Sequence, residues 1–222
     1  MRAAILQQWL KTPALVGAIM PSSRHLARVM ARRAGGAGLL VELGAGTGTI
    51  TAELVRQHPS APLILFEQNS TLAERLRSRF PQATIIAECF HARTDLLADL
   101  PGNAVFVSSL PFRSLPAQIA EPTIEFLHRL LTAAPQRRLI QFTYQPRAPF
   151  KAPAGLLWRR HVTVWRNAPP AGVWELGMQS CGNDLRHGTV IALPSIPAMN
   201  PGRYELSSPP AGQVRATPRA AP

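Results

Sequence analysis

The stretch Leu40-Val41-Glu42-Leu43-Gly44-Ala45-Gly46-Thr47-Gly48 decides the fold of this chain of 222 residues. It begins as an apolar run around one carboxylate, which predicts a buried β-strand. The glycines that follow allow a tight turn and a close approach of the backbone to a ligand. A helix expected from Thr49 would present its free amides there. The spacing is GxGxG rather than the GxGxxG of dinucleotide-binding proteins, so the stretch predicts a related but distinct ligand site.

Short apolar runs alternate with helical patterns on both sides of this stretch. Strands are predicted at residues 39–43, 63–66, 84–87, 104–108, 139–144 and 161–166, and helices at residues 49–57, 71–79 and 117–131. Thr71 and Glu74 have capping-box spacing at the start of the second helix. The alternation predicts an α/β fold with a doubly wound, mostly parallel, seven-stranded sheet. After Tyr144 no helix is expected, and residues 158–175 predict an antiparallel hairpin that turns at Asn167-Ala168-Pro169-Pro170.

Composition narrows the possible partners. The formal net charge is +12, and residues 1–41 contain no acid because the first carboxylate is Glu42. Such a balance favours an anionic partner: nucleic acid, a phospholipid surface or acidic metabolites. Cys89 and Cys181 are too few for a disulfide framework. The apolar stretches are shorter than the ~20 residues that cross a bilayer, and Gln7, Gln8 and Lys11 interrupt a signal peptide, so a cytoplasmic protein is expected.

The strand-and-glycine stretch resembles the first motif, E/DxGxGxG, of class I S-adenosylmethionine-dependent methyltransferases. The resemblance implies a Rossmann-like fold and S-adenosylmethionine as the cofactor. It further implies that the amino acid part of the cofactor is held by Glu42, Gly44, Ala45, Gly46, Thr47 and Gly48. Glu67 follows the next strand, where a carboxylate accepts hydrogen bonds from two ribose hydroxyls. Glu88 and Cys89 follow the third strand and are expected beside the adenine, and Ser108 ends the fourth strand beside the cofactor.

The loop Ser108-Ser109-Leu110-Pro111-Phe112 stands where methyltransferases of nucleic-acid amino groups carry N/D-P/L-P-Y/F. In those enzymes the Asn or Asp side chain and a backbone carbonyl bind the amine, and the aromatic ring stacks on the base. Ser109 is a poorer match to an adenine amino group, which weakens the nucleic-acid interpretation.

Three other segments resemble bacterial phospholipid N-methyltransferases. They are Ile19-Met20-Pro21-Ser22-Ser23, Gln141-Phe142-Thr143-Tyr144-Gln145-Pro146-Arg147 and Val164-Trp165-Arg166-Asn167-Ala168-Pro169-Pro170-Ala171. The resemblance covers residues 9–176 and includes the SxLP loop. It implies methylation of phosphatidylethanolamine toward phosphatidylcholine by a peripheral enzyme on the inner membrane of a bacterium.

Two basic amphipathic helices are expected in residues 1–34. Ile5, Leu6, Trp9 and Leu10 share one helical face, and Leu26, Val29 and Met30 share another with arginines outside it. Such faces can lie on anionic lipid, with membrane contacts from Trp9, Lys11, Arg24 and Arg28. The alternative is that the apolar stripes pack on the sheet. Residues 35–177 are the expected methyltransferase domain, and the Pro- and Ala-rich residues 178–222 are an expected unstructured tail.

Methyl transfer to an amine needs no metal, and the histidines show no metal-ligand spacing. Tyr144 is the candidate to relay a proton, and Ser109 is the candidate to orient the amine, as the two predicted catalytic residues. Leu110, Pro111, Tyr144 and Arg147 are the expected substrate-binding residues. Two alternatives stay open: an rRNA adenine N6-methyltransferase-like enzyme, and a catalytically idle membrane-binding protein with the same fold.

Overall fold

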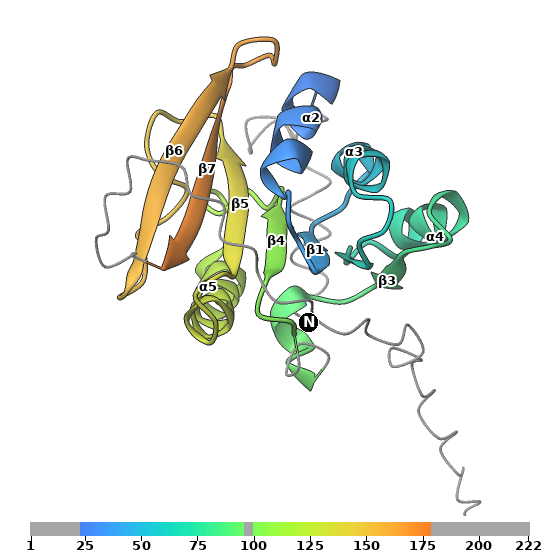
Figure 1. Cartoon of the computed structure of the whole chain (residues 1–222), viewed down its shortest axis with the longest axis horizontal. Helices are drawn as coiled ribbons and strands as arrows, with labels where there is room; N and C mark the ends of the chain where they lie inside the picture. The colour runs from blue at the N-terminus through green and yellow to red at the C-terminus, as the bar shows by residue number, and fades with distance from the viewer. Residues whose placement is uncertain (1–22, 96–99, 179–222) are drawn as a thin grey trace, which may run out of the picture. The chain divides into compact units, whose positions relative to one another are not determined.

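A computed structural model describes residues 23–95 and 100–178 of the chain. One sheet of seven strands runs through this part in the order β3-β2-β1-β4-β5-β7-β6 (Figure 1). The strands are β1 (Leu39–Leu43), β2 (Leu63–Phe66), β3 (Thr84–Ile86), β4 (Ala104–Ser108), β5 (Arg138–Thr143), β6 (Leu156–Val164) and β7 (Ala171–Met178). β1 to β5 are parallel, and β7 lies antiparallel between β5 and β6. The predicted α/β sheet and its terminal hairpin are confirmed.

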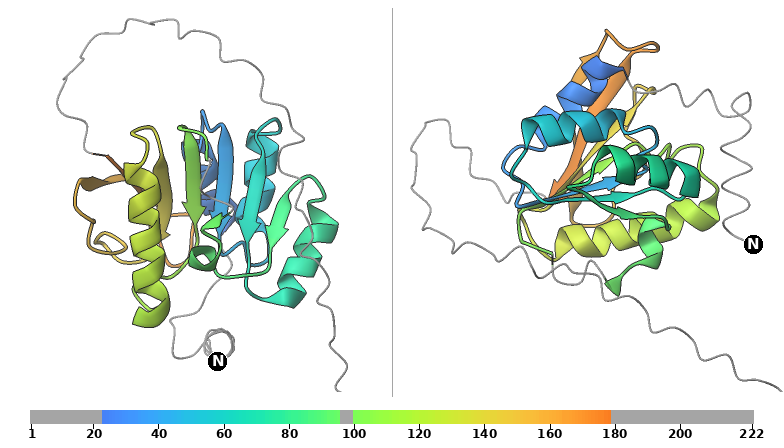
Figure 2. Two further views of the ribbon diagram at one scale, coloured as in Figure 1. Left: turned by 90° about the horizontal axis from the view of Figure 1, so that it is seen from below. Right: turned by 90° about the vertical axis from the view of Figure 1, so that its right-hand side faces the viewer.

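Helices cover both faces of the sheet, as Figure 2 shows. On one face lie α2 (Arg24–Arg33), α3 (Thr49–Gln57) and α4 (Ser70–Arg79), and on the other lies α5 (Ala117–Thr132). A short 3₁₀ turn, η1, spans Phe90–Ala92. Side chains alternate along β1: Leu39 and Val41 join the core under α5, whereas Leu40 joins the core under α2 and α3. The sheet is therefore buried on both faces, as a parallel sheet requires.

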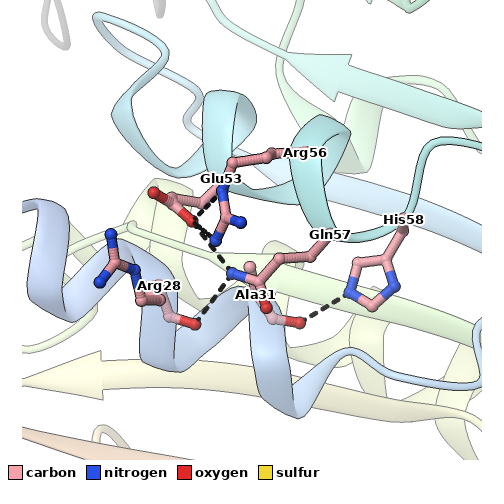
Figure 3. A network of polar contacts seen from close by, with 6 residues as sticks. All are labelled: Arg28, Ala31, Glu53, Arg56, Gln57 and His58. Carbon is pink, nitrogen blue, oxygen red and sulfur yellow. Dashed lines mark hydrogen bonds and ion pairs between the residues drawn. The ribbon is translucent and has the colours of Figure 1, made fainter.

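The apolar stripe of α2 faces the protein interior. Leu26 and Met30 are fully buried in the core cluster shared with α3. Figure 3 shows the polar contacts that tie the two helices together: Gln57 donates to the Arg28 carbonyl at 3.2 Å, and the His58 ring bonds the Ala31 carbonyl at 2.8 Å. The expectation that this stripe lies on lipid is wrong, because packing on the sheet takes the same side chains. The first predicted helix lies outside the described residues, with Trp9 and Lys11.

Helix α4 begins differently from its predicted start. Its N-cap is Asn69, whose side chain accepts a hydrogen bond from the Leu72 amide at 3.1 Å, so Thr71 and Glu74 lie inside the helix and form no capping box. Asn and Asp cap helices as well as Ser and Thr do. The structural consequence is that the chain between β2 and α4 is only Glu67-Gln68-Asn69, which fixes Glu67 close to the end of its strand.

Gly48 predicts a measurable packing effect. It has φ +78°, and a Cβ there would lie 2.7 Å from the Phe80 ring and 2.9 Å from Leu76. Gly48→Ala combines left-handed strain with a clash, so we expect it to lower the free energy of unfolding by about 2–4 kcal/mol. Gly36→Ala is the matched control, because Gly36 has φ +77° and open space around its Cα. Urea unfolding should show a loss of only about 1 kcal/mol there; equal losses would contradict the packing argument.

Candidate functional site

The predicted site residues lie along one edge of the sheet, beyond the carboxyl ends of the parallel strands. Glu67 follows β2, the glycine turn follows β1, Ser109 follows β4 and Tyr144 follows β5, and these strands are neighbours. Hydrogen bonds connect their ends: the Gly44 amide donates to the Phe66 carbonyl at 2.8 Å, and the Ser109 amide donates to the Leu43 carbonyl at 3.1 Å. In open α/β sheets, ligands bind at this edge where the strand order reverses.

The glycine turn approaches the loop after β4 closely. Gly44 has φ +73°, and a Cβ there would lie 2.8 Å from a Leu110 methyl carbon. Gly48 is the N-cap residue of helix α3 and has no side chain with which to cap it. The first-turn amides of α3 therefore have no side-chain acceptor and are available to an anionic or polar ligand group.

Glu67 is buried at the centre of this edge, with 6% of its surface exposed. One carboxylate oxygen accepts from the Gly46 amide at 2.8 Å, and the other accepts from the Asn69 amide at 2.8 Å. A carboxylate has about four lone-pair sites. Each oxygen therefore retains a position for a further donor, and the two amides fix the direction of both.

Glu42 is buried on the α3 side of β1. The Thr51 hydroxyl donates to one oxygen at 2.7 Å, while Oε1 has no hydrogen-bond partner among the described residues. Burial, opposed by the hydrogen bond from Thr51 and assisted by the neighbouring Glu67, raises the pKa of Glu42 to about 8. A buried unpartnered carboxyl oxygen is costly, so this group is suited to a positively charged ligand.

The pKa of Glu42 predicts how the ligand-free protein responds to pH. Its pKa is raised above that of the unfolded chain, so the folded protein holds an extra proton between about pH 4.5 and about 8. The free energy of unfolding should therefore fall as pH rises through this window, by about 5 kcal/mol in total. Urea unfolding at several pH values should show this slope in the wild type and a flatter curve in Glu42→Gln. Parallel curves would contradict the shifted pKa.

Glu88 and Cys89, which are predicted to lie beside the adenine, follow β3 at the same end of the parallel strands as Glu67. Glu88 is exposed, and its carboxylate pairs with the Arg93 guanidinium at 3.2 Å. Cys89 is half-buried, and burial followed by the charge of Glu88 raises the pKa of its thiol. A ligand that bound Glu88 would have to compete with Arg93.

Side-chain hydrogen bonds from Ser108 and Ser109 hold the loop after β4 in place. The Ser108 hydroxyl accepts from the Leu110 amide at 3.1 Å, and the Ser109 hydroxyl donates to the Gly44 carbonyl. The Pro111 carbonyl accepts from the Ser114 and Leu115 amides, which turns the chain toward α5. The proton of Ser109 is thus used within the protein, and its oxygen lone pairs remain for a ligand N–H.

Gln141 is a site residue whose individual role the sequence did not reveal. It lies on β5 opposite Ser108 and is 1% exposed. Its Nε2 donates to the Leu110 carbonyl at 3.0 Å and to the Phe142 carbonyl at 2.9 Å, which fixes the amide orientation. The signal is a lone amide within the apolar run of β5. Gln141 holds the Leu110 carbonyl in place.

Tyr144 stands immediately after β5. Its hydroxyl is buried without a hydrogen-bond partner among the described residues, and its ring packs edge-on against Phe142 at 5.4 Å between centroids. Burial raises its pKa, and the nearby Asn167 side chain opposes this shift more weakly. A protonated hydroxyl at this edge can donate to, or accept from, a bound amine. Arg147 is exposed three residues further on.

Residues 23–95 and 100–178 contain no group of three or more His, Cys, Asp or Glu side chains placed to hold a metal ion. In the same residues no helix has the length and apolar character needed to span a bilayer.

Comparison with known proteins supplies the fold assignment. The chain is similar to an O-methyltransferase family protein from Burkholderia thailandensis, with a TM-score of 0.51, 14% identity, and coverage of 72% of this chain and 57% of that one. It is also similar to precorrin-6y C5,15-methyltransferase from Geobacter metallireducens GS-15, with a TM-score of 0.50, 15% identity, and coverage of 69% and 87%. The chain has the class I methyltransferase fold. No family model matches its sequence.

Two curated proteins resemble the sequence of this methyltransferase-like chain. An ornithine lipid N-methyltransferase from Singulisphaera acidiphila is 29% identical over 183 residues, which cover 76% of this chain and 92% of that protein. A ribosomal RNA small subunit methyltransferase A from Thermotoga petrophila is 35% identical over 91 residues, which cover 40% and 32%. The first similarity covers about three quarters of the chain, and the second less than half of it.

Proposed function

We propose that the chain is an S-adenosylmethionine-dependent N-methyltransferase that methylates the amine of a lipid head group at an anionic membrane surface. The observation that carries the proposal is the 183-residue similarity to a lipid N-methyltransferase, which covers 92% of that protein. The arrangement of Glu67, Ser109 and Tyr144 along one sheet edge supports it. The expected location is the cytoplasmic face of a bacterial inner membrane.

The site fits S-adenosylmethionine as its cofactor. Glu67 offers two oriented oxygens for the ribose hydroxyls, and the turn from Gly44 to Gly48 leaves room for the backbone to approach the amino acid part. The unpartnered oxygen of Glu42 lies in the strand that leads into that turn. A ligand ammonium nearby would favour the ionised form of Glu42, so binding should release a proton below pH 8.

When bound, the cofactor supplies an electrophilic methyl group on a positively charged sulfur. The chain's own residues must provide a neutral, oriented amine. An alkylammonium with pKa near 10 is neutral in about one part in a thousand at pH 7, which corresponds to about 4 kcal/mol. The Ser109 oxygen can accept an amine N–H group, and Tyr144 is the residue that we propose to relay the released proton. The Leu110 carbonyl already accepts from Gln141 and from the Phe112 amide, so Gln141 is a positioning residue that holds the loop after Ser109 in place.

Phosphatidylethanolamine is the head group that the sequence resemblance implies, and ornithine lipid is the acceptor named for the curated relative. Both present a primary ammonium, and only the first carries a phosphate. Arg147 and Lys151 between β5 and β6, and Arg159 and Arg160 on β6, are exposed, and they are the candidates for a phosphate. The Arg160 guanidinium already stacks on Trp174 at 5.7 Å and donates to Thr163.

In the deciding experiment, the full chain is incubated with labelled S-adenosylmethionine and one of three acceptors, in parallel reactions. These are vesicles containing phosphatidylethanolamine, vesicles containing ornithine lipid, and total RNA. Labelled lipid in either vesicle supports the proposal and assigns the head group, and its mono-, di- or trimethyl products give the number of transfers. Label confined to RNA would overturn it.

An rRNA adenine methyltransferase is the second candidate, favoured by the 91-residue similarity and by the Leu110-Pro111-Phe112 loop. An Asn or Asp anchor would serve an adenine amino group better than Ser109 does. A third outcome of the same experiment, cofactor binding without methyl transfer to lipid or RNA, would favour the idle membrane-binding protein.

A further inference from the structure

The turn between β6 and β7 exposes an aromatic side chain at the edge of the sheet that carries the site. Trp165 follows the last residue of β6 and is 77% exposed, the largest exposure among the large hydrophobic side chains that lie on the described surface. β6 runs parallel to β5, and Thr143 pairs with Gly172 near the start of β7. The turn therefore lies at the same end of the strands as Tyr144, and Figures 1 and 2 show it beside α2.

The start of α2 is fastened to this turn. The Ser23 amide donates to the Asn167 side-chain oxygen at 3.0 Å, and the Asn167 amide group donates to the Pro169 carbonyl at 2.7 Å. Arg24 and His25, the next residues, are exposed. The contacts between α2 and α3 seen in Figure 3 hold the helix against the domain. Trp165, Arg166, Arg24 and His25 thus come from two segments that are fixed to each other, and together we call them the turn surface.

Charge at this end of the sheet is one-sided. The sequence contains no acid between Glu125 and Glu175 and none before Glu42. Glu175 is already paired, since its carboxylate contacts His161 at 3.2 Å and Arg138 at 3.7 Å. The pKa of Glu53 is lowered mainly by its hydrogen bond from Arg56 and to a small extent by the charge of Arg28, one turn further along α2, so we leave Arg28 out of the turn surface. Arg166 and Arg24 pair with no acid of residues 23–95 and 100–178, which leaves them available to an anionic partner.

We propose that the turn surface docks the protein on an anionic phospholipid bilayer, with Trp165 at the level of the head groups. The proposal rests on the proposed function, because docking serves to bring a lipid acceptor to the site. The turn surface itself is inferred from its own residues. Trp is favoured at the membrane interface, and each Arg close to an anionic leaflet contributes about 1 kcal/mol. Docking here would bring the loops after β4 and β5 to the bilayer, so that a head group can reach Ser109 while its acyl chains stay in lipid.

A bilayer fits the turn surface better than a nucleic acid does. The residues exposed beside Trp165 and Arg166 are Ala168, Pro169 and Pro170, which offer no side-chain donor or acceptor for a base edge. Asn167 is the one amide of the turn, and both ends of its side chain are used within the protein. A proline-rich turn with one tryptophan and one arginine is suited to a surface that is anionic outside and apolar beneath.

Vesicle binding of the full chain, without cofactor, tests the proposal. The vesicles are phosphatidylcholine with about one third phosphatidylglycerol, and affinity is measured by co-sedimentation. We expect Trp165→Ala to weaken binding about tenfold and Arg166→Ala about fivefold. Leu157→Ala is the matched apolar control, since Leu157 is 41% exposed at the other end of β6, and Arg77→Ala on α4 is the charge control. Both controls should bind as the wild type does.

Brominated lipids provide a direct measurement of Trp165 itself. We compare the loss of tryptophan fluorescence on vesicle binding between the wild type and Trp165→Phe. The difference between the two losses reports whether the Trp165 ring enters the bilayer, because quenching of the other tryptophans cancels. Quenching supports the proposal. No quenching of Trp165, equal losses in Leu157→Ala, or Trp165-dependent binding to RNA in place of vesicles would overturn it.

The results also separate this proposal from the proposed function. Trp165-dependent vesicle binding without methyl transfer to any lipid would refute the function and leave the docking surface standing. Methyl transfer to detergent-dispersed lipid without Trp165-dependent vesicle binding would support the proposed function and refute the docking surface.

Discussion

Glu67→Ala is expected to lower the affinity for S-adenosylmethionine about 100-fold or more. The Glu67 carboxylate accepts hydrogen bonds from the Gly46 and Asn69 amides at 2.8 Å each, and we propose that its remaining lone pairs bind the ribose hydroxyls. The substitution removes charge-assisted hydrogen bonds and disorders the two loops that make the site. Titration calorimetry with S-adenosylmethionine measures the loss.

Two further variants separate binding from folding in that experiment. Glu67→Gln retains an oxygen for one amide, so its affinity should lie between those of the wild type and Glu67→Ala. Glu74→Ala removes an exposed acid from α4 and should bind the cofactor normally. If Glu67→Gln binds as tightly as the wild type, the carboxylate does not contact the ribose.

Tyr144→Phe is expected to reduce kcat about 100-fold while the free energy of unfolding stays the same or rises slightly. The buried hydroxyl forms no well-aligned hydrogen bond with the described residues and has only a weak polar interaction with Asn167, so its removal costs little stability. The same deletion would remove the group that we propose to relay the amine proton, and positioned proton transfer contributes about 10²-fold or more. Single-turnover methyl transfer and urea unfolding give the two quantities.

The two measurements together distinguish a catalytic from a structural tyrosine. A structural role would appear as a loss of stability with kcat unchanged. Trp158→Phe is a matched control because its Nε1 is also buried without a partner, but the ring packs against Phe150 in the other core cluster. It should change kcat little.

Much of the sheet could be predicted because its strands are continuous apolar runs. The ranges for β1, β2 and β4 match the observed ones, since each run ends at a glycine, a carboxylate or a pair of serines. β6 was predicted to begin at His161 and begins at Leu156. Its first residues, including Trp158, Arg159 and Arg160, mix apolar and charged side chains because β6 is an edge strand, which obscures the usual alternation.

The positions of the carboxylates along the edge were predictable, but their environments were not. Strand order places Glu42 and Glu67 together, and local spacing suggested a third acid at Glu88. Only tertiary packing buries the first two and leaves Glu88 exposed beside Arg93. The same limit applies to α2, whose apolar stripe fits lipid or a sheet equally well in sequence. Contacts such as Gln141 with the Leu110 carbonyl join residues 31 apart and leave no local pattern.

The two borders of the sheet differ in a way that affects how the protein behaves when it is crowded. β3 is only three residues long, whereas β6 has nine residues. The outer side of β6 could therefore present unpaired backbone N–H and C=O groups to a strand of another chain. Its register shifts between Arg160 and Val162, and Arg159 and Arg160 are exposed beside the shift. A bulge and closely spaced cations hinder strand-to-strand pairing. The arginines of β6 should therefore also protect the folded protein against aggregation through this border.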